Sequence, residues 1–275
     1  MTMQAVPYLA AFRARFLLML QYRAAALAGF ATQLWWGAIR ILVFAAFYGV
    51  NAAAAPISLT DAVTYVWLGQ ALLALQPWIA DPEIGQAVRT GGVGYDRLRP
   101  LDAYGYWYAR SVGWMLARAL PRAVLMVLAA GIVLPLVGLE DWAWQPPSGV
   151  TGALLFVPAF ALMTMLGAAV LMLANIIVAA SLNERGVNAV LTPLVIVFSG
   201  SLLPLDFFPD ALRPFLHVQP FAGLVDIPFR IYFADLSGAA AAQGLALQAG
   251  WTLVLILLGR LAMERMMRRL EMQGG

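Results

Sequence analysis

Few residues in this sequence are of a type that carries chemistry. The chain has no cysteine and a single histidine, His217, and all 17 of its basic residues are arginine. A nucleotide-binding P-loop needs a lysine that reaches the phosphates, so this chain cannot form one. Without cysteine the chain has no thiolate nucleophile and no thiolate metal ligand. His217 lacks the neighbours that catalysis or metal binding requires, so we expect it to have a structural or surface role.

One polar stretch, DPEIGQAVRTGGVGYDRLRPLD at residues 81–102, interrupts an apolar chain. Its GGVG lacks the third glycine of the GxGxxG pattern and follows no strand, which excludes a dinucleotide site. Asp81 can cap a helix, Pro82 suits the first helical position, and Gly91 with its glycine neighbour supplies a stop. The stretch therefore predicts a short helix over residues 82–90.

The predicted helix has one apolar face, because Ile84 and Val88 recur at helical spacing. It would be roughly 13 Å long at 1.5 Å per residue, which is too short to cross a bilayer. A short, capped helix with a preformed apolar face suits docking into a groove of a cytoplasmic partner. The alternative is a solvated loop with incidental helical structure.

The composition indicates an integral membrane protein. The chain is 63% hydrophobic and only 11% charged, with a mean hydropathy of +0.81. A bilayer-crossing helix needs roughly 20 mostly apolar residues, and the chain offers several such runs. We therefore predict an all-α integral membrane protein with six transmembrane helices. The predicted spans lie near residues 27–50, 62–80, 112–138, 150–180, 187–204 and 239–260.

The arginines predict the orientation of these spans. They are concentrated in the N-terminal segment, in residues 81–122 and after the last span, whereas residues 51–61 and 139–149 contain none. The positive-inside rule then places both termini and the 81–111 loop in the cytoplasm. No cleavable signal peptide is evident. The arginine-containing start suits either a helix on the cytoplasmic membrane face or the first turn of a long span.

These expectations amount to a single transmembrane domain over residues 1–275. Its parts outside the spans are a cytoplasmic amphipathic segment at 1–26, a cytoplasmic loop at 81–111, an outer segment at 205–238 and a cytoplasmic tail at 261–275. The outer segment belongs to a stretch, 199–235, with prolines at 204, 209, 214, 220 and 228. Such a density disfavours a continuous helix, so we expect two short re-entrant helices or a structural plug.

Arg40 is the charged residue deep within the first predicted span. Such a residue usually faces the bundle interior or water, which makes Arg40 a candidate for the translocation path. Alternatively, the span edges differ and Arg40 extends to an interface. Asp61 and Asp226 are candidate partners for its guanidinium, and the sequence does not choose between them.

Four features together resemble the permeases of ABC-2 type exporters, in particular the compact six-span members. They are the amphipathic start, DPEIGQAVRTGGVGYDRLRP after the second span, FSGSLLPLDFFP after the fifth span, and Trp251 followed by the closing RRLEMQGG. The resemblance covers nearly the whole chain. It implies a cytoplasmic coupling helix in the first loop, short re-entrant helices that close the outer exit, and location in a bacterial plasma (inner) membrane.

The resemblance also implies roles for individual residues. The residues expected to contact an ATPase are Asp81, Glu83, Ile84, Val88, Arg89 and Arg97, with Ile84 and Val88 seated in its groove. The residues expected in the outer gate are Pro204, Asp206, Phe208 and Pro209.

The function that these features predict is that of a permease subunit of an ATP-driven exporter. The chain would form half of the pathway, together with an identical or related permease, and would move a drug-like, lipidic or other amphipathic solute. It would bind no cofactor and no nucleic acid, since ATP and Mg would bind to two copies of a separate ATPase subunit. The alternative is an ion-coupled secondary transporter, although such a transporter needs ionisable residues at mid-membrane. An intramembrane enzyme or a membrane scaffold has less support.

Overall fold

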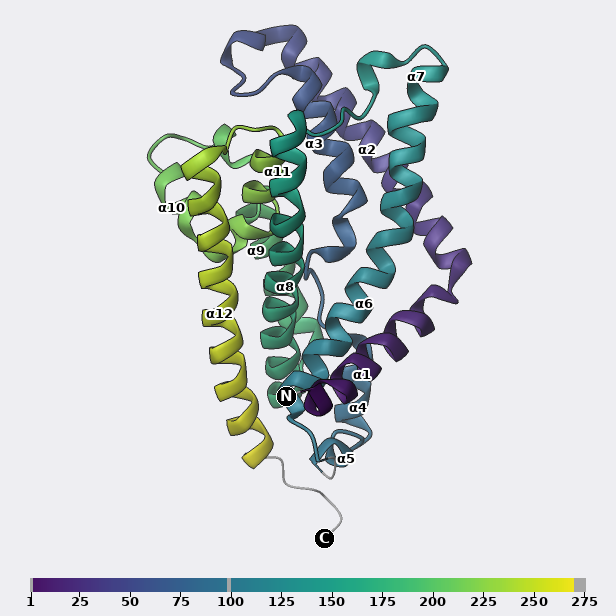
Figure 1. The fold of residues 1–275 in the computed structure, drawn as a ribbon, viewed down its shortest axis with the longest axis vertical. Coiled ribbons are helices and arrows are strands. Elements are labelled where there is room, and N and C mark those ends of the chain that lie inside the picture. Colours follow the sequence, from purple (N-terminus) through teal and green to yellow (C-terminus); the bar gives the residue numbers. More distant parts are fainter. Residues whose placement is uncertain (1, 98–99, 270–275) are drawn as a thin grey trace.

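The computed structural model describes residues 2–97 and 100–269, and within these ranges every regular element is a helix (Figure 1). The α-helices, in chain order, are α1 (Thr2–Leu20), α2 (Arg23–Asn51), α3 (Leu59–Ala71), α4 (Pro82–Arg89), α5 (Gly94–Arg97), α6 (Ala103–Met126), α7 (Leu134–Leu136), α8 (Gly149–Ser181), α9 (Glu184–Phe198), α10 (Arg213–Val218), α11 (Asp226–Tyr232) and α12 (Gly238–Arg269). A π-helical turn, Val127–Val133, joins α6 to α7 without a break. Short 3₁₀ helices occur at Ala52–Ala54, Leu73–Leu75, Glu140–Trp142, Leu205–Phe207 and Pro220–Leu224.

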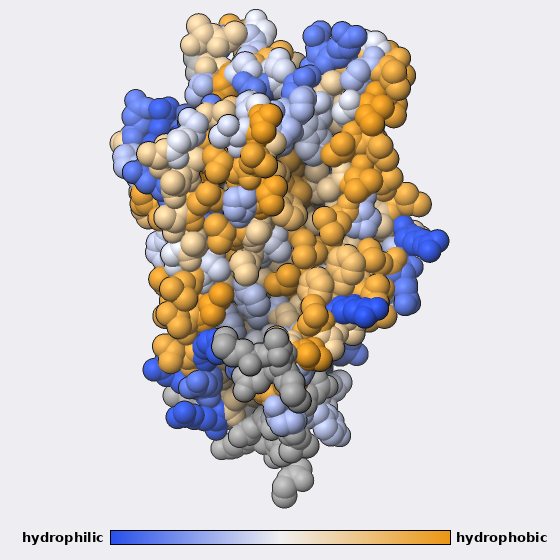
Figure 2. Space-filling view, viewed as in Figure 1, coloured by the Kyte–Doolittle hydropathy of each residue, from blue (hydrophilic) through white to orange (hydrophobic). Residues whose placement is uncertain are grey.

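Four helices are long and apolar enough to cross a membrane. They are Arg23–Asn51, Ala103–Leu136, Gly149–Ser181 and Gly238–Arg268. Their side chains form an apolar surface between more polar ends, as Figure 2 shows. On a water-exposed surface such an area would be unfavourable, whereas lipid tails solvate it. The prediction of an all-α membrane protein is confirmed, and four of its six predicted spans coincide with these long apolar helices.

The other two predicted spans, 62–80 and 187–204, are not full-length helices. α3 has 13 residues and α9 has 15, so each is only about 20 Å long against a hydrocarbon core of about 30 Å. Pro77 follows α3 and disfavours helical backbone before it. α9 ends just before Gly200, whose φ of 88° lies in the left-handed region. A hydropathy pattern counts the apolar residues on both sides of each interruption as one span, which is why these two spans were predicted too long.

The two ends of the molecule differ in their elements. α1, α4 and α5 lie together at the end where α12 terminates, and α7 lies at the opposite end (Figure 1). We refer to these as the α4 end and the α7 end.

Between α9 and α12 the chain forms several short helices, which agrees with the predicted effect of the prolines. α11 is almost completely buried, and the backbone N–H of Ser148 donates to the carbonyl of Tyr232 at 2.9 Å.

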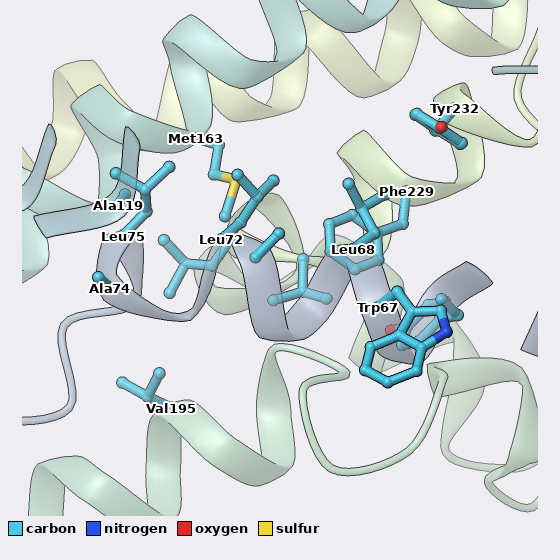
Figure 3. Packing of buried hydrophobic residues seen from close by; sticks show 14 of the residues in the cluster. Trp67, Leu68, Leu72, Ala74, Leu75, Ala119, Met163, Val195, Phe229 and Tyr232 are labelled. Carbon is cyan, nitrogen blue, oxygen red and sulfur yellow. The ribbon is translucent and has the colours of Figure 1, made fainter. Parts of the chain in front are cut away.

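The short helix α3 lies at the centre of the hydrophobic core. All of its residues from Ala62 to Ala71 are buried. Figure 3 shows its side chains together with residues from four other helices: Ala119 of α6, Met163 of α8, Val195 of α9 and Phe229 of α11. The helix therefore packs against protein rather than lipid.

Close backbone packing at one glycine helps to bring α8 to this core. A Cβ added to Gly167 of α8 would lie 2.7 Å from the carbonyl oxygen of Leu75 and 2.8 Å from Cε of Met115. Small residues at helix contacts allow such an approach in membrane proteins. Gly167 is therefore the position at which α8 contacts the segment that follows α3.

We expect Gly167→Ala to destabilise the protein by about 1–3 kcal/mol, the usual effect of overpacking. The matched control is Gly250→Ala in α12, where no atom lies within 4 Å of an added Cβ. This control should be neutral or slightly stabilising, since alanine favours helix by about 1 kcal/mol over glycine. Thermal unfolding of both variants in detergent checks the expectation. Equal midpoints would show that the Gly167 contact is not tight.

Candidate functional site

The sequence-predicted helix at the α4 end forms as expected. The Asp81 side chain accepts a hydrogen bond from the backbone N–H of Glu83 at 3.0 Å, Pro82 occupies the first turn, and Gly91 has a φ of 73° just beyond the helix. Unlike a typical helix cap, Asp81 is buried, with a relative exposure of 2%. The helix is therefore fixed to the protein at its first residue.

Arginines from two other helices neutralise the carboxylates of α4. Arg15 of α1, itself buried, pairs with Asp81 at 3.3 Å and also with Glu83. Arg110 of α6 pairs with Glu83 at 2.8 Å. Burial raises the pKa of Asp81, and the nearby Arg15 charge acts in the opposite direction. These charges hold α1, α4 and α6 together.

The linker before α4, residues 78–81, is bound by polar side chains of α8 and α9. Asn175 of α8 accepts a hydrogen bond from the backbone N–H of Asp81 at 2.8 Å. Asn188 of α9 accepts one from Ala80 at 2.9 Å, and Thr192 donates to the carbonyl of Trp78 at 2.7 Å. We refer to this linker, with Arg15, Asp81, Glu83, Arg110 and the three side chains that bind it, as the α4 junction.

The sequence analysis missed most partners in the α4 junction. Asn175 carries a detectable signal, because it is a polar residue within a long apolar span, and such residues usually have a specific partner. Arg15 carries a weaker one as a cation in an apolar segment. Asn188 and Thr192 are unremarkable in sequence, since only the tertiary fold brings them to the linker.

The apolar face of α4 faces the protein's own helices, which corrects the expectation that Ile84 is available to a partner. Ile84 is 6% exposed and belongs to a buried cluster with Met172 and Ile176 of α8. Val88 is half-buried against the same cluster. The physical reason is that α8 of the same chain forms part of the groove that receives this face.

The surface that α4 itself leaves exposed is polar. Pro82, Glu83, Gln86 and Arg89 are exposed, and Tyr95 beyond α4 is 71% exposed. The exposed Arg89 side chain lies 3.1 Å from Glu184 at the start of α9, so the turn between α8 and α9 adjoins α4. Arg97 ends α5, and its side chain lies outside what the structure describes.

A second cluster of charges lies in the outer segment. His217 of α10 contacts Asp206 through Nε2 and the buried Asp226 through Nδ1, each at 3.2 Å. Arg230 lies 3.8 Å from Asp206 and 3.6 Å from Asp226. The expectation that His217 is structural agrees with this geometry, since it bridges segments that the prolines separate.

The neighbouring outer residues have different environments. Pro204 is buried, Phe208 is half-buried, and Pro209 is exposed. The carbonyl of Phe208 accepts a hydrogen bond from Nε of Arg213 at 2.8 Å. Of the four expected gate residues, Asp206 is therefore the one that takes part in the charge cluster.

Arg40 is held by backbone carbonyls rather than by either aspartate that the sequence suggested. Its Nη2 donates to the carbonyls of Ser201 and Leu202, each at 2.8 Å. Asp61 instead accepts from Ser58 at the start of α3, and Asp226 lies in the His217 cluster. Arg40 lines a half-open cavity of about 950 Å³ between α2, α3 and the segment after α9.

The first expected outcome at this site concerns the buried ion pair. Arg15→Met leaves the Asp81 carboxylate without its nearest cation, which should cost about 3 kcal/mol or more and raise the pKa of Asp81 further. Adding Asp81→Asn should recover part of the loss, since asparagine can still cap α4. Thermal unfolding of the wild type, both single variants and the double variant provides the coupling energy. Additive effects would show that the pair is not coupled.

The second expected outcome concerns pH. Hydrogen bonds to Asp206 and Asp226 raise the pKa of His217 to about 9, and the bond to His217 lowers the pKa of Asp206. A raised histidine pKa stabilises the fold fully below the ordinary value near 6.5, and this contribution disappears as the pH rises through about 9. The lowered aspartate pKa acts above pH 4 and is lost in acid.

The unfolding temperature should therefore decrease steadily between about pH 6.5 and pH 9 and level off above that. His217→Gln should show a smaller decrease over the same range, because glutamine does not titrate. Identical pH profiles for the wild type and His217→Gln would contradict the assignment.

Comparison with known proteins adds one finding to this geometry. A family model described as "ABC-2 family transporter protein" matches residues 34–274. No curated protein matches the chain.

Proposed function

Because this chain belongs to the ABC-2 transporter family, we propose that it is the permease subunit of an ATP-driven exporter. Membership makes it a multi-pass membrane transport protein and an ABC transporter permease. The proposal adds that it forms half of a translocation pathway, that a separate subunit binds ATP and Mg, and that the direction is export. The observation that carries it is the family match together with the braced helix α4 at one end of the molecule.

The α4 junction supports a docking site for the ATPase. Six hydrogen bonds or ion pairs fix the start of α4 and the linker before it to α1, α6, α8 and α9. A force applied to α4 would therefore pass to helices on several sides. Asp81, Ile84 and Val88 are buried or half-buried, so in this proposal they hold α4 against the rest of the protein and do not contact the ATPase. The proposed contact surface consists of Glu83, Gln86, Arg89, Tyr95 and the adjoining α8–α9 turn.

The connectivity supports six crossings, although only four helices are of full length. α2 runs toward the α7 end, whereas α6 begins at the α4 end (Figure 1). The residues between them must return across the molecule, and α3 with the linker to Asp81 provides this pass. Likewise α8 terminates at the α4 end and α12 begins toward the other, so α9 carries the return. We propose these two shorter passes as the second and fifth spans.

The orientation in the membrane and the role of the short outer helices follow from the same six-span arrangement. The arginine distribution favours a cytoplasmic α4 end, with both termini, in a bacterial plasma membrane. The short helices α10 and α11 then act as re-entrant elements near the outer exit, where His217 of α10 contacts Asp226 of α11. The second permease, identical or related, provides the other half of the pathway.

The test is mild-detergent purification of the tagged full chain from its native membranes, with mass spectrometry to identify a co-purified ATPase by its P-loop sequence GxxxxGK(S/T). Gln86→Asp combined with Tyr95→Asp places two charges on the exposed α4 surface and should reduce ATPase recovery about tenfold or more, as for loss of a docking contact. The matched control is Asn51→Asp with Ser148→Asp, two exposed positions near the α7 end. The control should retain the ATPase.

Both double variants should insert into the membrane and unfold at the wild-type temperature, because the substituted side chains are exposed. Full ATPase recovery by the α4 double variant would exclude this surface as the docking site. Recovery of the wild-type chain alone, under several gentle conditions, would exclude the ATP-driven function itself.

A further inference from the structure

The Arg40 cavity has an apolar, aromatic wall drawn from separate parts of the chain. Its volume of about 950 Å³ is at the upper end of the range for small-molecule sites. The aromatic residues that line it are Trp36, Phe44, Phe47, Trp78 and Phe207. A molecule that occupies this cavity therefore needs a sizeable apolar body.

One face of α2 contributes the polar groups of this cavity as well as aromatic ones. Gln33, Trp36, Arg40 and Phe47 all line it, and their spacing of three, four and seven residues places them on one side of a helix. Gln33 and Arg40 are seven residues apart, or about 10 Å along the axis. The face thus presents an amide and a guanidinium at a defined separation.

The charge of the cavity is positive. The two carbonyls that hold Arg40 satisfy part of its hydrogen bonding but carry no negative charge, and no carboxylate among the described residues forms an ion pair with it. Asp206 is the carboxylate that lines the cavity, and it is already bonded to His217 and lies near Arg230. A bound anion would therefore find an unneutralised guanidinium, whereas a bound cation would be repelled.

Two glutamines add amide groups, and one amide oxygen, that of Gln33, is unsatisfied. Gln33 and Gln70 line the cavity from α2 and α3, and each is only 4% exposed. Oε1 of Gln33 has no donor among the described residues. Leaving such an acceptor unpaired costs about 1–3 kcal/mol, so a hydroxyl or amide N–H from a ligand would be stabilised there.

The depth of Arg40 indicates that the bound anionic group does not lie at the level of the lipid headgroups. Arg40 lies about 25 Å along α2 from Arg23, close to the middle of the helix. Lipid headgroups lie at the two surfaces, roughly 15 Å from the centre of the hydrocarbon core. An anionic group beside Arg40 must therefore belong to a molecule that has left either surface.

From these observations we infer that the cavity binds an amphipathic anion. Its anionic group contacts Arg40, its apolar body lies against the aromatic wall, and an uncharged hydrogen-bond donor lies toward Gln33. The inference rests on the proposed function for one point, that the bound molecule is the transported substrate.

The experiment uses the full chain alone in phosphatidylcholine nanodiscs and two brominated probes. They are 9,10-dibromostearate, an anion, and the trimethylammonium cation with the same brominated chain. Bromine quenches nearby tryptophan fluorescence, and Trp36 and Trp78 line the cavity. The difference in quenching between the wild type and Trp36→Phe/Trp78→Phe isolates the cavity signal from lipid-facing tryptophans.

We expect the anion to bind at least about tenfold more tightly than the cation, as one charge-assisted hydrogen bond would allow. Arg40→Gln should weaken anion binding about tenfold and leave cation binding unchanged or stronger. Arg40→Lys, which retains the charge, should preserve most of the anion affinity. Arg89→Gln, a matched removal of charge at the α4 end, should have no effect.

Equal affinities for the two probes in the wild type, or tighter binding of the cation, would overturn the inference whatever the variants do. Anion binding that survives Arg40→Gln would also overturn it. Because this measurement needs no ATPase, its failure leaves the proposed permease function intact if the ATPase still co-purifies. Conversely, if the chain binds the anion but no ATPase co-purifies, the binding site is supported and the ATP-driven function is excluded.

Discussion

The ion pair between Arg15 and Asp81 is the interaction on which the α4 end depends. Charges removed from water are costly, and a buried pair is tolerated only when further hydrogen bonds complete it. Here Asp81 caps α4 and its backbone N–H donates to Asn175, while Arg15 also reaches Glu83. If Arg15 moved away, the carboxylate would face apolar surroundings. The first helix of the chain and the junction between its third and fourth helices are therefore fixed together.

The sequence alone predicted the elements whose signals are local. Twenty or more apolar residues specify a spanning helix, and Asp81, Pro82 and Gly91 specify where α4 begins and ends. It failed where local patterns conflict with tertiary structure. Hydropathy does not register that Pro77 ends a helical region. Nor does the apolar face of α4 reveal whether the groove that receives Ile84 belongs to a partner or, as observed, to α8.

The functional residues were predictable to different extents for the same reason. Arg40 stood out because a charge within an apolar span is rare, yet its partners are backbone carbonyls, which no sequence pattern identifies. His217 appeared isolated because its carboxylate partners lie on separate short helices. Only the packing of the proline-interrupted segment brings Asp206 and Asp226 to the two sides of one imidazole ring.

The central position of α3 has a consequence for the way the protein is made. α3 leaves the ribosome early, but the residues that surround it include Met163, Val195 and Phe229, which are synthesised much later. With 13 residues, α3 is too short to span the bilayer as a helix by itself. The early half of the chain must therefore remain incompletely packed until those later residues have been synthesised. Assembly of this core is a late event that depends on the C-terminal half, rather than a sequence of helices completed one after another.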